Sequence, residues 1–69
     1  MNANLAGVNH EERLLNAAEV AEYLNVSRAM AYNLMKKGEI KTVAIRAARR
    51  VRPEDLRRYI EENIQISAN

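Results

Sequence analysis

The sequence of 69 residues contains no cysteine, no tryptophan and no phenylalanine. Without cysteine, neither disulfides nor thiolate metal sites can hold the fold together. Three tyrosines are the only aromatic residues, so the hydrophobic core must consist mainly of aliphatic side chains. A chain of this length buries a modest share of its surface, and we expect one small domain of marginal stability.

Long apolar runs are absent as well. No stretch approaches the roughly 18 apolar residues that span a bilayer, and residues 1–7 lack the basic start and apolar stretch of a secretory signal. We therefore expect a cytoplasmic protein with no membrane partner. Residues 1–13 show no sustained apolar period, which predicts a flexible arm, followed by one domain over residues 14–64 and a frayed tail over residues 65–69.

The sequence shows no arrangement of residues typical of a catalytic site. The single histidine, His10, falls in the predicted arm beside two solvated glutamates. The sequence has no glycine-rich phosphate loop, no serine nucleophile motif and no zinc-ligand spacing. It therefore predicts no enzymatic activity, no metal site, no cofactor and no small-molecule ligand.

The net charge of +2 conceals an uneven distribution. Residues 36–58 hold nine basic side chains against three acidic ones, and residues 41–52 hold five basic side chains and no acidic one. The segments on either side are acidic overall. Such a basic stretch attracts polyanions, of which nucleic acid is the usual one in a small cytoplasmic protein. A solvated basic face without a partner is the alternative that charge alone leaves open.

Two short helices are predicted in the first half of the domain. Asn16 followed by Glu19 fits a capping box ahead of a helical apolar period over residues 17–24. After a three-residue turn, Ser27 can cap a second helix over residues 28–37. The inward face of this second helix is predicted to carry Ala31, Leu34 and Met35, and its outward face Arg28, Ala29, Tyr32, Asn33 and Lys36.

From Ile40 the apolar period changes from helical to alternating, which predicts a two-stranded hairpin with one apolar and one basic face. Val43 and Ile45 are expected on the apolar face. The turn is expected near Ala47 and Ala48, although the lack of glycine and asparagine there also leaves a longer, open loop as an alternative.

A third helix is predicted to begin at Pro53, which suits the first helical position. The acidic residues Glu54 and Asp55 follow it, where they suit the positive end of the helix dipole. The expected buried face of this helix consists of Leu56, Tyr59, Ile60 and Ile64.

Two helices joined by a tight turn, with the second one basic on its outer face, form a helix-turn-helix. The motifs EVAEYL, NVSR, AYNLMKKGEI and EDLRRYI, spread over residues 14–60, resemble the excisionase-type, MerR-like winged helix-turn-helix family. The resemblance implies a mostly α, α+β winged helix-turn-helix from a bacterium, phage or mobile element. Some members are recombination factors that bend DNA for an integrase, and others are small transcription regulators.

Carried over by position, the resemblance places base and phosphate contacts on the second helix and on the hairpin, or wing. In the second helix these are Ser27, Arg28, Tyr32, Asn33 and Lys36, and in the wing they are Arg46, Arg49 and Arg50. An outward Asn33 can pair with adenine, but many relatives carry arginine at this position, so a base preference does not transfer. Lys36 and Lys37 already suit the helix C-terminus, which makes a phosphate contact an additional role.

Each of these residues also has a simpler structural interpretation. Ser27 is first of all a helix cap, Arg28 fits a solvated first turn, and Tyr32 can pack its ring against a neighbouring element. The wing arginines have no carboxylate nearby in sequence, which favours phosphate contacts. Relatives often have glycine in the wing turn, where this chain has Arg46-Ala47-Ala48, so the shape of the wing is not given by the resemblance.

The sequence as a whole predicts specific binding of duplex DNA, with an integrase or further copies of the chain as partners on the DNA. The rival prediction is an adaptor whose basic face docks on an acidic protein. Donor side chains on the outer face of the second helix, in place of an apolar centre, argue against a protein interface there.

Overall fold

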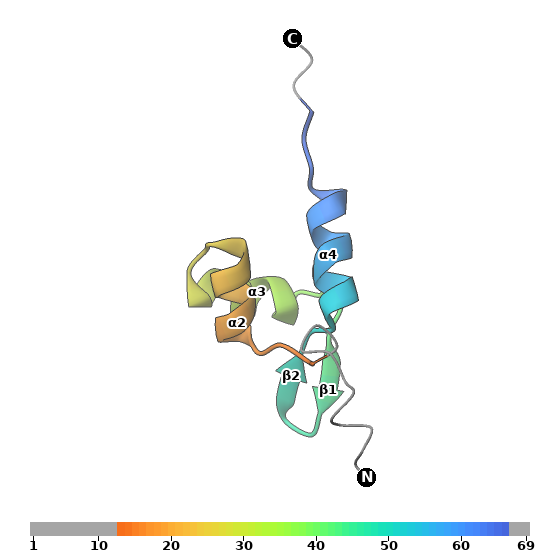
Figure 1. Cartoon of the computed structure of the whole chain (residues 1–69). Helices are drawn as coiled ribbons and strands as arrows, with labels where there is room; N and C mark the ends of the chain where they lie inside the picture. The colour runs from red at the N-terminus through yellow and green to blue at the C-terminus, as the bar shows by residue number, and fades with distance from the viewer. Residues whose placement is uncertain (1–12, 67–69) are drawn as a thin grey trace.

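The computed structural model describes residues 13–66, which form three helices and a two-stranded antiparallel hairpin (Figure 1). Along the chain these elements are α2 (Ala17–Leu24), α3 (Arg28–Lys36), β1 (Val43–Ile45), β2 (Ala48–Arg50) and α4 (Pro53–Glu62). The predicted α+β architecture, mostly α with a wing before the last helix, is confirmed. The predicted arm, apart from Arg13, and the last three residues of the predicted tail lie outside the described residues.

Helix α2 begins and ends where the sequence predicts. The capping box is present: the Asn16 side chain accepts a hydrogen bond from the Glu19 amide at 2.8 Å, and the Glu19 carboxylate accepts one from the Asn16 amide at 2.9 Å. At the other end Asn25 adopts a left-handed conformation with φ of 59° and ends the helix. This reversal creates the short turn before α3.

Helix α3 is capped by Ser27, whose hydroxyl accepts a hydrogen bond from the Met30 amide at 3.0 Å. The helix ends at Lys36 with Lys37 as its C-cap, so the predicted end at Lys37 was one residue too long. Gly38 follows with φ of 82°, a conformation that residues with a side chain rarely adopt. The chain turns there toward the wing.

The core gathers residues from every helix and from both ends of the wing. Its fully or almost fully buried apolar members are Val20, Ala21, Ala31, Met35, Ile40, Val51 and Leu56. Ile40 precedes the wing and Val51 follows it, so the wing is anchored in the core at both ends. Leu24 and Leu34 pack against this cluster and are half-buried, so the predicted place of Leu34 on the inward face of the second helix holds only in part. The core-facing row of α3 runs through Ala31 and Met35, which leaves Leu34 at its edge.

The wing is a tight hairpin in which Val43 pairs with Arg50, Ala44 with Arg49 and Ile45 with Ala48. The turn therefore consists of Arg46 and Ala47, one residue earlier than predicted, and the alternative of a longer loop was wrong. Arg46 supplies the positive φ, 57°, that glycine or asparagine usually provides in such a turn. Val43 is half-buried and Ile45 is 50% exposed, so the predicted apolar face of the wing is buried only in part.

Helix α4 starts with Pro53 at its first position, as predicted, and runs away from the wing (Figure 1). Leu56 is buried, and Tyr59 and Ile60 pack partly against the core. Ile64 lies beyond the end of the helix and is 55% exposed, so its predicted place on the buried face was wrong. Asp55, expected only to complement the dipole, is buried with 3% exposure.

Candidate nucleic-acid interface

The outer face of α3 is built by residues three and four positions apart. Ala29, Asn33 and Lys36 follow one another at that spacing, opposite the buried row of Ala31 and Met35, and all three are exposed. This face is short in apolar surface and carries an amide and an ammonium group, which can reach base edges or phosphates.

The other sequence-predicted residues of this segment flank that face. Ser27, Arg28, Tyr32 and Lys37 are exposed. Ser27 keeps its cap bond with Met30, but its hydroxyl hydrogen is left to donate. Tyr32 is 50% exposed and lies on the side of α3 that faces the wing. All predicted residues of this segment are therefore exposed, with Asn33 and Lys36 on the outer face of α3 and Tyr32 toward the wing.

The three wing arginines occupy different positions. Arg46 stands at the turn, and Arg49 and Arg50 are successive residues of β2. Because side chains alternate along a strand, Arg49 and Arg50 start on opposite faces of the wing, so the predicted single basic face was wrong. Arg50 is half-buried and donates to the Arg49 carbonyl oxygen at 2.9 Å, whereas Arg46 and Arg49 are exposed.

A groove of about 290 Å³ separates the wing from the helices. Its walls come from the first turn of α2, the wing-facing side of α3, and the turn and second strand of the wing. The lining residues are Asn16, Ala17, Ala18, Tyr32, Met35, Ala47, Arg49 and Arg50. The groove therefore joins Tyr32 of α3 to two of the predicted wing arginines. That the start of α2 belongs to this surface was not predicted from the sequence.

Ion pairing separates the basic residues of the domain into two groups. Within residues 13–66 the arginines with a carboxylate partner are Arg13, Arg52 and Arg58. The basic residues predicted at the interface all lack such a partner among the described residues: Arg28, Lys36, Lys37, Arg46, Arg49 and Arg50. The same holds for Lys41 and for Arg57 on α4. Within residues 13–66, therefore, no ion pair neutralises the basic side chains of α3 and the wing.

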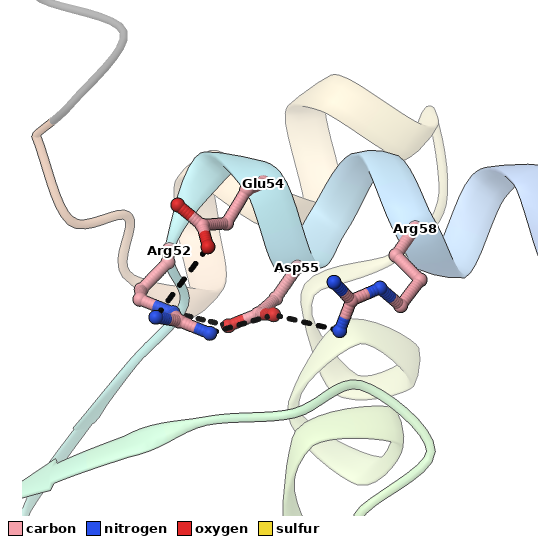
Figure 2. A network of polar contacts seen from close by, with 4 residues as sticks. All are labelled: Arg52, Glu54, Asp55 and Arg58. Carbon is pink, nitrogen blue, oxygen red and sulfur yellow. Dashed lines mark hydrogen bonds and ion pairs between the residues drawn. The ribbon is translucent and has the colours of Figure 1, made fainter.

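Figure 2 shows how the paired arginines are used at the start of α4. Arg52 donates from Nε to Asp55 at 2.6 Å and from Nη2 to the other carboxylate oxygen at 3.1 Å. Glu54 lies 3.5 Å from Arg52, and Arg58 lies 3.7 Å from Asp55. The bonds from Arg52 lower the pKa of Asp55 below its usual value, and the same contact raises the pKa of Arg52.

This network fixes the joint between the wing and α4. Arg52 directly follows Val51, the buried residue at the end of the wing, and Asp55 lies in the first turn of α4. Arg52 and Asp55 are three positions apart, a spacing from which their pairing could have been predicted, but a buried carboxylate is uncommon and was not expected. Arg52 therefore does not belong to the basic residues without a carboxylate partner.

Among residues 13–66 no group of three histidine, cysteine, aspartate or glutamate side chains stands close enough to hold a metal ion. No helix in this part of the chain is both long and apolar enough to cross a membrane. His10 lies outside the described residues.

Comparison with known families decides how this surface is interpreted. The profile of a helix-turn-helix domain family matches residues 14–64. The chain belongs to this excisionase-like helix-turn-helix family. No curated protein and no solved structure matches the chain. Membership in this family implies DNA as a partner. Members of the family are typically not enzymes. The hairpin after α3 is the wing-like element of this helix-turn-helix domain.

Proposed function

We propose that this helix-turn-helix protein binds duplex DNA in a sequence-specific manner, with α3 in the major groove and the wing on the adjacent backbone or minor groove. The observation that carries the proposal is the set of basic side chains on α3 and the wing, from Arg28 to Arg50, that have no carboxylate partner among the described residues. Elsewhere in the described chain, Arg13, Arg52 and Arg58 are paired with acidic neighbours, whereas Arg57 on α4 is not. Unbalanced charge beside an exposed helix is the pattern expected for contacts with phosphates.

Within that interface we assign specificity and affinity to different elements. Asn33, at the centre of the outer face of α3, contacts a base edge, with Tyr32 beside it. Ser27, Arg28, Lys36 and Lys37 surround this centre and contact phosphates. The wing contributes further phosphate contacts through Arg46, Arg49 and Arg50. Phosphate contacts supply affinity but little sequence information, whereas base contacts supply specificity.

Titration of duplex DNA at several salt concentrations tests the proposal. If the surface contacts four to seven phosphates, the logarithm of the binding constant should fall with the logarithm of salt at a slope of roughly −4 to −6. A flat response would refute DNA binding by this surface. Binding to an acidic protein in preference to duplex DNA would support the adaptor in its place.

Variants then test the division of roles, after circular dichroism has shown that each one folds. Asn33→Ala should weaken binding to the selected site by about 1–3 kcal/mol and leave random-sequence binding and the salt slope almost unchanged. The double variant Arg49→Ala, Arg50→Ala should weaken both kinds of binding and flatten the slope by about two. Arg57→Ala is the matched control, because it removes one basic side chain without a carboxylate partner from α4, outside the proposed interface. Loss of sequence preference in the wing variant alone would reverse the assignment.

The proposed biological role is that of an accessory factor for a recombinase or a small transcription regulator, acting on the nucleoid in the cytoplasm. DNA shape separates the two roles. An accessory factor that binds as several adjacent copies should bend the duplex, which fluorescence transfer between the duplex ends can measure. Direct repeats beside a recombination site among selected sequences would favour this role, whereas straight DNA at saturation and a promoter element would favour the regulator.

A further inference from the structure

We propose that the groove between α3 and the wing seats one phosphate of the DNA backbone, and that this contact sets the register of the domain on the duplex. The inference rests on the DNA binding proposed above and adds a position to it. The major groove and the neighbouring minor groove are separated by a strand of phosphates. If α3 enters one groove and the wing reaches the other, that strand must pass between these elements, where the 290 Å³ groove lies.

The groove offers charged and polar donors from separate elements. Tyr32 lines it from α3, and Arg49 and Arg50 line it from the wing. Because these successive strand residues start on opposite faces and Arg50 donates to the Arg49 carbonyl oxygen, a single guanidinium is required to face the groove. None of the lining residues is acidic. Guanidinium groups form short, charge-assisted hydrogen bonds with phosphate oxygens. Neither arginine has a carboxylate partner within residues 13–66 that a phosphate would have to displace.

The opposite wall of the groove adds backbone donors. Ala17 and Ala18 are the first two residues of α2, so their N–H groups have no acceptor within the helix. The short side chains of these alanines leave the backbone accessible to an anion, at the end of the helix where the dipole is positive. The nearby Glu19 carboxylate does not oppose an anion with a free charge, because it is bonded to the Asn16 amide and to Arg13 at 2.9 Å.

The converging donors explain why the contact would set the register. The phosphate would touch the first helix, the second helix and the wing together, so that a shift of the domain along the backbone would break all of these contacts at once. Such a contact carries no sequence information itself. It would, however, hold Asn33 at a constant position relative to the base edges in the major groove, as specific base contacts require.

A carboxylate placed in the groove tests the inference. Ala18 is half-exposed and lies outside the core cluster. Ala18→Glu places an acidic residue in the first turn of α2, where a negative charge favours the helix. We expect it to weaken binding to both selected and random duplexes by roughly 10- to 100-fold, because like charges at an interface repel strongly. Ala18→Gln, with the same size and no charge, should lose at most a few-fold. Gln65→Glu adds the same charge on the exposed segment beyond α4 and should bind as the wild type does.

Single neutral methylphosphonate linkages, moved stepwise through the bound site, give a readout that does not depend on one variant. Several linkages should weaken binding of the wild type, and one of them per bound domain, at the seated phosphate, should have almost no further effect on Ala18→Glu. Absence of such a linkage, or equal losses for Ala18→Glu and Ala18→Gln, would overturn the phosphate seat. If the wild type binds duplex DNA but Ala18→Glu binds equally well, the seat alone is refuted. If the wild type binds no duplex DNA, the proposed function itself fails.

Discussion

Replacing Asp55 with asparagine should destabilise the domain strongly for a single polar substitution. The carboxylate is 3% exposed, accepts two hydrogen bonds from Arg52 and lies 3.7 Å from Arg58. Asparagine can accept one of these bonds, but its NH₂ group would then face a guanidinium, and the charge is lost. Removing one partner of a fully buried pair costs about 3–5 kcal/mol. Because the Arg52 side chain is 38% exposed and can be hydrated, we expect about 1–3 kcal/mol.

Glu54→Gln is a control on the same turn of the same helix. Glu54 also lies near Arg52, at 3.5 Å, but its side chain is 60% exposed. Exposed ion pairs contribute little, so the change in unfolding free energy should stay within about 0.5 kcal/mol. Thermal unfolding followed by circular dichroism measures both variants, and in a domain of this size each kcal/mol shifts the melting temperature by about 4–8 °C.

The effect of Asp55→Asn should also depend on pH in a defined direction. The pKa of Asp55 is lower in the folded state than in the unfolded state, because Arg52 donates to its ionised form. The stabilisation is therefore complete above the unfolded pKa, near 4, and is lost as the pH falls through the folded pKa. The difference between wild type and Asp55→Asn should shrink in urea titrations from pH 7 toward pH 3. A difference that stays constant over this range, or no difference at pH 7, would refute the reasoning.

Three further outcomes follow from the described contacts. Leu56→Ala should cost about 2–5 kcal/mol and unfold much of the domain, whereas Leu34→Ala, at a half-buried position, should cost less; equal melting temperatures would contradict the packing. Arg46→Gly should raise stability by up to about 1 kcal/mol by relieving the positive φ and should weaken DNA binding at low salt; a lower melting temperature would argue against strain at the turn. Ser27→Ala should cost about 1 kcal/mol, measured by urea unfolding, because the Met30 amide loses its cap.

The helices could be predicted because their signals are local. Asn16 and Glu19 stand three residues apart, and Ser27 and Pro53 are residues whose chemistry suits the start of a helix. In each case the partner groups lie within one helical turn, so that the side chains and the backbone specify the same boundary. The helix ends at Leu24 and Lys36 were predicted to within one residue for the same reason.

The wing and the joint to α4 depend on contacts that spacing does not reveal. Arg46 adopts a left-handed conformation that favours glycine, and no local signal distinguishes it from Ala47 as the start of the turn. The burial of Asp55 depends on Arg52 folding back over it, which opposes the general preference of carboxylates for solvent. The groove was not foreseen because its lining comes from three segments distant in sequence.

The isolated pairing of Leu15 with Val51 has a consequence for the order in which the domain folds. Each residue donates a backbone hydrogen bond to the carbonyl of the other at 2.8 Å. Closing this bridge requires a loop that contains α2, α3 and the whole wing, whereas α2 and α3 pack through contacts close in sequence. Contacts between distant residues lose more chain entropy and form more slowly. The helix-turn-helix should therefore assemble first and the wing should dock last, and amide hydrogen exchange at these two residues would report the opening of the wing separately from the unfolding of the helices.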